Sequence, residues 1–214
     1  MRSCVAIGLV LTASIAMLHP SAAAEIDLSG TGTFKPPSEE QLAGLPADLA
    51  FTRTDLASGK WSFFVRYEDG TVDADADPFV GRYVGAIRVF RVTVGSTTVD
   101  LPIDQAELAV SDGGLGFAHR ESIRLATRSV APYGLLRVDW VQLNQHSRSD
   151  DLRGAGGALS SDSMPTPSTI ANLATSSAFD RYLQLRIDRP GDARPLLYLS
   201  SSKVSVTAAS AAAR

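Results

Sequence analysis

The residues best suited to chemistry are three aspartates at alternate positions, Asp73, Asp75 and Asp77, in a strongly acidic segment. Carboxylates at this spacing can gather the hard oxygen ligands that Ca²⁺ prefers. Glu68 or Asp69 could complete the coordination shell. The sequence therefore offers a candidate calcium site and no other cofactor.

The same acidic segment does not match an EF-hand loop. Pro78 follows Asp77 where that loop has a glycine, and Val84 occupies the twelfth position from Asp73, where a glutamate should stand. The alternative is a solvated loop whose charge protects the edge of a sheet from pairing with other chains. Both interpretations stay open at this point.

Few residues are suited to catalysis. After residue 24 the histidines are His119 and His146, and no Gly-x-Ser-x-Gly motif marks a nucleophilic serine. Two histidines without neighbouring ligands also argue against a structural zinc site. Two carboxylates could converge in the fold to cleave a glycosidic bond, but the sequence selects no pair. We therefore assign no catalytic residue.

Aromatic side chains, which present a rigid apolar face with a polar tip, are candidate contacts for a sugar. Most lie on the apolar face of a predicted strand, where core packing is the expected role: Trp61, Tyr67, Tyr83, Trp140 and Tyr198. Tyr133, in a Pro-Tyr-Gly turn, and Tyr182, opposite Leu183, are expected to be exposed. We name these two tyrosines, with the polar Asn144–Ser163 segment, as candidate ligand contacts.

The first 24 residues have the features of a secretory signal peptide. Arg2 supplies the positive charge, Cys4–Leu18 the apolar stretch, and Ala22 to Ala24 the small-residue cleavage site. An uncleaved membrane anchor is the alternative, although the apolar stretch is shorter than the ~20 residues that span a bilayer. Cleavage after Ala24 would remove the single cysteine and leave an exported protein, periplasmic or extracellular, without a membrane span.

Composition excludes several function classes. Of the 214 residues, 44% are hydrophobic and 20% charged, which is typical of a globular chain rather than a disordered one. Lys and Arg total 20 against 23 Asp and Glu, so the excess of basic residues found in nucleic-acid-binding domains is missing. We expect a monomeric single domain over residues 25–207, followed by a flexible Ala-rich tail at 208–214.

Alternation of apolar and polar residues dominates the chain after its leader and predicts strands with one buried face. The alternation is clearest over Tyr182–Asp188, Leu136–Trp140 and Trp61–Tyr67. Arg82–Val94 is apolar on both faces and predicts one long central strand, bulged or bent. Weaker strands are expected at 26–34, 49–54, 97–101, 106–110, 115–120, 122–128, 196–199 and 203–207.

Helical turns are expected at only two places, Pro37–Leu42 with Ser38 as its N-cap, and Ser168–Ala174. Many short strands separated by turns such as Gly95-Ser96 indicate an all-β fold. The expected architecture is an antiparallel β-sandwich, jelly-roll-like or immunoglobulin-like, with a closed barrel as the alternative.

Two segments resemble a recurrent, uncharacterised β-rich domain of secreted bacterial proteins, many of which carry a PEP-CTERM sorting signal. They are Gly81–Ile87, which leads into Val92–Gly95, and Ser160–Thr166. A Gly-Thr-Gly-Thr-Phe start at Gly30 and an aromatic strand through Tyr67 follow the same order. The resemblance implies export and a β fold but no catalytic residues, and this chain shows no Pro-Glu-Pro motif of the sorting signal.

Together these observations predict an exported, non-catalytic β-sandwich that acts as an envelope or matrix component or as a polysaccharide-binding module. A secreted hydrolase, whose acidic residues converge only in the fold, is the alternative. A buried carboxylate pair in a cleft would favour the enzyme, and a strip of exposed aromatic residues would favour the binding module. A purely structural role, with another envelope protein as partner, predicts neither feature. No nucleic-acid partner is expected.

Overall fold

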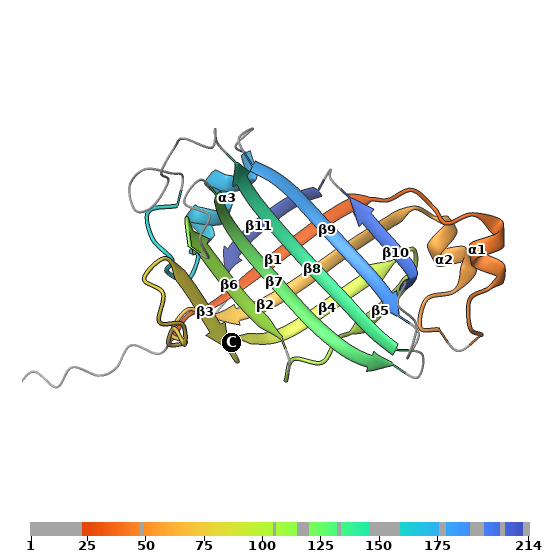
Figure 1. The fold of residues 1–214 in the computed structure, drawn as a ribbon, viewed down its shortest axis with the longest axis horizontal. Helices are drawn as coiled ribbons and strands as arrows, with labels where there is room; N and C mark the ends of the chain where they lie inside the picture. Colours follow the sequence, from red (N-terminus) through yellow and green to blue (C-terminus); the bar gives the residue numbers. More distant parts are fainter. Residues whose placement is uncertain are drawn as a thin grey trace, which may run out of the picture.

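Two antiparallel sheets that pack face to face make up the fold (Figure 1). The computed structural model describes residues 23–47, 49–104, 106–114, 120–131, 134–145, 159–175, 179–188, 195–201 and 204–211. Within these ranges neither sheet closes into a barrel, so the prediction of an all-β sandwich is confirmed.

The five-stranded sheet has the order β11-β1-β2-β4-β5. Its strands are β1 (Glu25–Thr33), β2 (Lys60–Glu68), β4 (Ile87–Val94), β5 (Thr97–Asp100) and β11 (Val204–Ser210). The six-stranded sheet has the order β10-β9-β8-β7-β6-β3. Its strands are β3 (Val80–Val84), β6 (Glu107–Asp112), β7 (Arg120–Ala131), β8 (Gly134–Gln145), β9 (Phe179–Asp188) and β10 (Pro195–Ser201).

The core lies between the sheets and follows the alternation seen in the sequence. In β2 every second residue is buried: Trp61, Phe63, Val65 and Tyr67. These side chains belong to one buried cluster with the inward residues of the facing sheet, among them Leu108, Val110, Ile123 and Leu125. Gly30 faces the same interior, and a Cβ there would lie 2.1 Å from the ring of its cross-strand partner Phe63. A side chain at this position would therefore displace the core.

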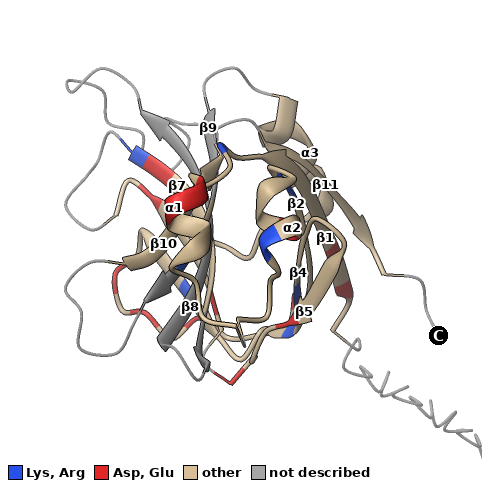
Figure 2. Ribbon diagram, turned by 90° about the vertical axis from the view of Figure 1, so that its right-hand side faces the viewer, with Lys and Arg blue, Asp and Glu red and all other residues tan. Residues whose placement is uncertain are grey.

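Two short helices cover one end of the sandwich, where Figure 2 shows them between the sheets. Helix α1 is Glu39–Ala43 and α2 is Arg53–Ala57, and each begins with a capping box, from Ser38 and Thr52 respectively. The turn predicted near Ser38 is confirmed. The strand predicted at 49–54 is wrong, because the Thr52-x-x-Asp55 capping box starts a helix within that range.

Asp55 ties α2 to the β4–β5 hairpin. Its carboxylate accepts hydrogen bonds from the hydroxyls of Thr52 and Thr97, both at 2.7 Å, and from the backbone N–H and hydroxyl of Ser96, both at 2.9 Å. These bonds, led by those from Thr52 and Thr97, hold the pKa of Asp55 far below its usual range. The ionised carboxylate is therefore part of the folded structure.

A third helix, α3 (Pro167–Thr175), packs beside β11 and buries Ile170 and Leu173. It confirms the helical turn predicted at Ser168–Ala174. No helix within the described residues is long and apolar enough to cross a membrane.

Two other boundaries differ from expectation. The segment Arg82–Val94 is not one strand, because Gly85, at φ +76°, turns the chain from β3 in one sheet to β4 in the other. The bulge expected in this segment is present in β4, where the register shifts at Arg88 so that Ile87 and Phe90 are both buried, and this explains why the segment looked apolar on both faces. The tail expected from Ala208 is also ordered as far as Ser210, which pairs with Ile26. Residues 1–22 and 115–119, which contain most of the expected signal peptide and one expected strand, lie outside the described residues.

Candidate functional site

The outer face of the five-stranded sheet carries a row of hydroxyl side chains, one on each strand. Ser205 on β11 pairs with Thr31 on β1, which pairs in turn with Ser62 on β2. Ser62 pairs with Thr93 on β4, and Thr93 pairs with Thr98 on β5. Because adjacent strands lie about 4.8 Å apart, the row is roughly 19 Å long. We call these five residues the hydroxyl row.

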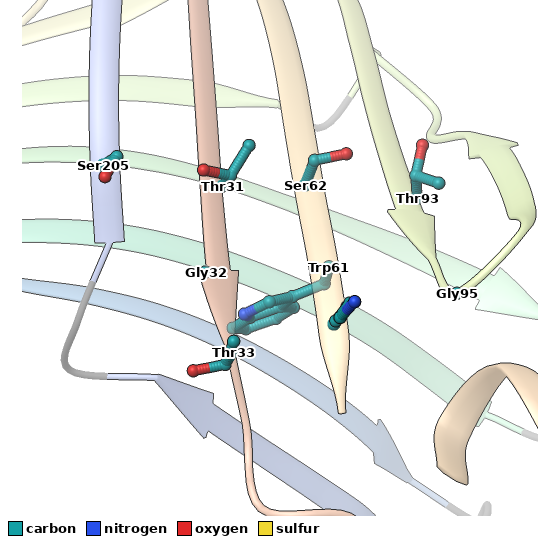
Figure 3. Close-up of a pocket in the computed structure, with 9 residues that line it drawn as sticks. Thr31, Gly32, Thr33, Trp61, Ser62, Thr93, Gly95 and Ser205 are labelled. Atoms are coloured by element: carbon teal, nitrogen blue, oxygen red, sulfur yellow. The ribbon is translucent and has the colours of Figure 1, made fainter. Parts of the chain in front are cut away.

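A groove of about 460 Å³ lies over one end of this sheet, and we call it the hydroxyl groove (Figure 3). Four members of the hydroxyl row line it, each on a different strand. The other lining residues are Gly32, Thr33, Lys60, Trp61 and Gly95. The described lining thus offers hydroxyl groups, one ammonium group and an indole, and it includes no carboxylate.

Trp61 is the buried member of this lining. It lies on the core face of β2 and is 3% exposed, with its ring edge-on to Phe34 at a centroid distance of 5.7 Å. Its cross-strand partner, Gly32, also lines the groove. The Nε1–H of Trp61 has no acceptor among the described residues. A buried donor without a partner costs about 1–3 kcal/mol, and the Nε1 atom is closed to solvent in this structure, so a ligand oxygen would remove this penalty only by reaching beneath the surface of the groove.

Most of the hydroxyl row is available for new hydrogen bonds. The hydroxyls of Thr93 and Thr98 lie 2.9 Å apart and bond to each other. Those of Thr31, Ser62 and Ser205 bond to no other described residue. Each hydroxyl can donate one hydrogen bond and accept two, so the groove can match a ligand that is itself rich in hydroxyl groups.

A second groove of about 410 Å³ lies along the edge strand β10, and we call it the Tyr198 groove. It is lined by Lys35, Pro36, Pro37, Ser38 and Gln41 on one side and by Leu197, Tyr198, Leu199 and Ser200 on the other. Tyr198 is 50% exposed, so the expectation that it packs in the core is wrong. Buried Leu197 and Leu199 on either side of it already pointed to the outward face, because strand side chains alternate.

The other aromatic predictions have mixed outcomes. Trp61, Tyr67 and Tyr83 are buried, which confirms their assignment to the core. Tyr133 lies outside the described residues, as does most of Asn144–Ser163. Tyr182 pairs with Val141 in the ladder between β8 and β9, but its side chain is not among those described, so its role as a ligand contact stays a prediction.

The alternating aspartates form a chain of turns. Asp73 accepts a hydrogen bond from the N–H of Asp75 at 2.9 Å, Asp75 from that of Asp77 at 3.0 Å, and Asp77 from that of Phe79 at 3.0 Å. This side-chain-to-backbone bond across two residues is the Asx turn. Asp73 also accepts the N–H of Arg82 at 2.7 Å, so the loop is joined to β3.

These turns account for the spacing without a metal. The three aspartates are partly exposed and Val72, Ala74 and Ala76 are exposed, so the segment is a surface loop, in keeping with the expected alternative to a calcium site. Among the described residues no group of three or more His, Cys, Asp or Glu could hold a metal ion. Calcium at Asp73, Asp75 and Asp77 therefore stays a prediction with no preformed site behind it.

The segment Leu159–Thr166 is held by side chains from both sheets. Tyr67 donates to the Pro165 carbonyl and Tyr83 to the Asp162 carbonyl, each at 2.8 Å, while Glu121 accepts the Leu159 N–H at 2.7 Å. We call these three side-chain bonds, from Tyr67, Tyr83 and Glu121, the segment clamp. Within the segment, burial raises the pKa of Asp162, and the carboxylates of Asp73 and Asp77 raise it further.

The segment clamp explains the two motifs that suggested a family. Gly81 lies beneath the same segment, and a Cβ on it would come within 2.1 Å of the Asp162 carbonyl oxygen. The Gly81–Ile87 and Ser160–Thr166 motifs therefore contact each other through Gly81, Tyr83 and Asp162, as parts of one packing arrangement.

Asp112 and Glu121 form a pair of buried carboxylic acids that sequence reasoning missed. They are direct cross-strand partners on β6 and β7, at 1% and 0% exposure. Both continue the inward face of their strands, after Val110 and before Ile123. Neither lines the hydroxyl groove or the Tyr198 groove.

The chain matches no known protein-family model, no curated protein and no solved structure. Its resemblance to the β-rich domain of secreted bacterial proteins therefore stays a prediction. What the chain does has to be argued from its own surfaces.

Proposed function

We propose that this chain is an exported, non-catalytic β-sandwich that binds a polysaccharide in the hydroxyl groove. The observation that carries the proposal is a groove lined by four hydroxyl side chains in register on four strands, with the unpartnered Nε1–H of Trp61 buried beneath it. A sugar chain supplies ring and hydroxyl oxygens that accept from such a donor. Its hydroxyl groups can also exchange hydrogen bonds with Thr31, Ser62 and Ser205.

Two further features support export and binding. The first strand begins at Glu25, the residue that follows the expected cleavage site. The groove lies on a sheet rather than on a loop, so its side chains are held at fixed spacings before a ligand arrives. Such preorganisation reduces the entropy lost on binding.

The hydrolase alternative rests on a different observation, the buried pair of Asp112 and Glu121. Two acids facing each other in a low-dielectric site are one arrangement that hydrolases use. Glu121, however, already accepts the backbone N–H of Leu159, and neither acid lines either groove. The pair therefore supports a role in holding the Leu159–Thr166 segment more directly than one in catalysis, and we rank the binding module first.

The test begins with the full-length chain, expressed with its own N-terminal segment and purified from the periplasm of a bacterial host. Its intact mass reports whether cleavage occurs after Ala24. The purified protein is then applied to a polysaccharide array, and binding is followed by tryptophan fluorescence in a Trp140→Phe variant, which leaves Trp61 as the one indole. Selective binding with a change in Trp61 emission is the expected result.

Variants locate the site. Loss of one hydrogen bond costs about 0.5–1.5 kcal/mol, so Thr31→Val and Ser62→Ala should each weaken binding by about twofold to twelvefold. Trp61→Phe, which keeps an aromatic ring but removes the N–H, should weaken binding at least as much; its affinity is measured by calorimetry with Trp140 intact, because this variant has no Trp61 emission. Thr207→Val is the matched control, because Thr207 is exposed on β11 but does not line the groove. An array with no bound polysaccharide, or equal affinity in all four variants, would overturn the proposal.

A further inference from the structure

We infer that the polysaccharide is anionic, and that its binding site continues from the hydroxyl groove across Thr33–Lys35 to Tyr198. This inference rests on the proposed function and adds the chemical class of the ligand and the extent of the site.

The two grooves contain basic side chains without acidic ones. Lys60 lines the hydroxyl groove and Lys35 lines the Tyr198 groove, while no aspartate or glutamate is among the described residues lining either. The nearest acids along the chain are Glu39 and Glu40 to Lys35 and Asp55 to Lys60, and none of the three lines either groove. The carboxylate of Asp55 lies next to Gly95 at the border of the hydroxyl groove, where it is held by hydrogen bonds from Ser96 and Thr97. The whole chain carries a net charge of −3, so the two lysines give these grooves a charge opposite to that of the protein as a whole.

The lysines also differ from the arginines on the same sheet. Arg66, Arg88 and Arg91 are each paired with a carboxylate on a neighbouring strand. The side chains of Lys35 and Lys60 are exposed, and neither ammonium group makes an ion pair or a hydrogen bond with another described residue. The arginine charges are therefore neutralised within the protein, whereas the two ammonium groups remain available for a ligand.

The grooves border the same stretch of backbone. Thr33 lines the hydroxyl groove and Lys35 the Tyr198 groove, and two residues of extended chain span at most about 7 Å. Phe34 between them is buried against Trp61, so it does not stand between the two grooves. Ser200 and Ser205, at the end of β10 and the start of β11, line one groove each.

This arrangement assigns a role to each part of the site. The ammonium groups of Lys60 and Lys35 form charge-assisted hydrogen bonds with carboxylate or sulfate groups of the sugar chain. The hydroxyl row bonds to its hydroxyls, and the half-exposed ring of Tyr198 stacks on a sugar face. Because the four hydroxyl residues that line the groove already span roughly 14 Å, the ligand is a chain and not a single sugar.

The experiment compares polymers and short fragments. The probes are alginate as a polyuronate, a sulfated galactan, neutral dextran, and the disaccharide fragments of each, with affinity read from Trp61 fluorescence in the Trp140→Phe background. At least one anionic polymer should bind more tightly than dextran. Its affinity should fall as salt rises to about 1 M, because screening shortens the Debye length to about 3 Å.

Substitutions then test the two ends of the site. Lys60→Gln and Lys35→Gln should each weaken binding of the anionic polymer about fivefold, as expected for an exposed ion pair. Tyr198→Ala should weaken binding of the polymer about fivefold and leave the disaccharide unchanged. Arg82→Gln is the control, because it changes the net charge by the same amount on β3, where Arg82 pairs with Glu107.

The outcomes separate this inference from the proposed function. If dextran binds as tightly as the anionic polymers and the lysine variants bind normally, the ligand is neutral and the inference fails while the proposed function stands. If the anionic polymer binds but Tyr198→Ala has no effect, the continuous site is wrong. If no polymer binds, both proposals fail.

Discussion

Tyr67→Phe tests whether the segment clamp stabilises the fold. The Tyr67 side chain is fully buried, and its hydroxyl donates a 2.8 Å hydrogen bond to the carbonyl of Pro165 across the end of the sandwich. Phenylalanine keeps the ring in the core and removes only the donor. The carbonyl is then left without this partner in a site that the hydroxyl itself shielded from water.

The expected loss follows from that geometry. A buried carbonyl that loses its donor costs about 1–3 kcal/mol, and we expect about 2 kcal/mol for Tyr67→Phe. Tyr83→Phe removes an equivalent bond to Asp162 that is only partly buried, so we expect about 1 kcal/mol. Both hydroxyls hold one segment, so the double variant should show a coupling of about 0.5 kcal/mol or more.

Urea unfolding followed by circular dichroism measures these changes. With a slope of about 2 kcal/mol per molar urea, Tyr67→Phe should lower the midpoint by about 1 M while the slope stays constant. A midpoint within about 0.2 M of the parent protein would refute the reasoning, and so would a larger loss in Tyr83→Phe than in Tyr67→Phe. Strict additivity in the double variant would show that the two bonds act independently.

Three further predictions concern pH and packing. Burial raises the pKa of Tyr67 well above its usual range and that of Tyr83 to about 12. Because tyrosine in the unfolded chain ionises near pH 10, the free energy of unfolding should be constant up to about pH 10 and fall as the pH approaches 12. The melting temperature of the double phenylalanine variant should fall less steeply over the same range. The pKa of Asp55 is lowered, so the ionised carboxylate should stabilise the fold above about pH 4, and this stabilisation should be lost as the pH falls further. Asp55→Asn should therefore lower the melting temperature at pH 7 and make it depend less on pH in the acid range. The same dependence on acid pH in the variant and the parent protein would contradict this. Gly30→Ala should cost about 1–3 kcal/mol in urea unfolding, because its Cβ would meet a buried ring at 2.1 Å, whereas Gly44→Ala, with 3.7 Å to the nearest atom, should be nearly neutral.

Much of the fold could be predicted because strand alternation is a local property. The buried residues of β2 are the ones that the alternation indicated, and the strands predicted at Tyr182–Asp188 and Leu136–Trp140 lie within β9 and β8. Boundaries failed where a single residue changed the chain's direction. Gly85 divides a continuous apolar run between two sheets, and the capping box at Thr52 turns an expected strand into a helix.

The candidate site could not be predicted because it depends on register. Thr31, Ser62, Thr93 and Ser205 are ordinary outward residues of four strands, and nothing in the local sequence says that they pair in one line. Likewise, Lys35 and Lys60 are 25 positions apart in the chain, and only the fold places them in adjoining grooves. Tyr198 is the exception, since the leucines on both sides of it already indicated an exposed ring.

The aspartates at 73, 75 and 77 show why residue type and spacing alone do not identify a metal site. A carboxylate every second residue suits a calcium loop, but it equally suits a series of Asx turns in which each side chain accepts the N–H two positions ahead. In an Asx turn the Oδ1 accepts a backbone N–H, so the spacing of the aspartates follows from the turns alone. The bonds from Asp75, Asp77 and Phe79 match the second arrangement, so the acidic spacing is explained by how the loop folds back to β3. The hydroxyl groove shows the reverse case: its residue types suggest nothing individually, and only the shared outward orientation of the four hydroxyl residues makes it a candidate binding surface.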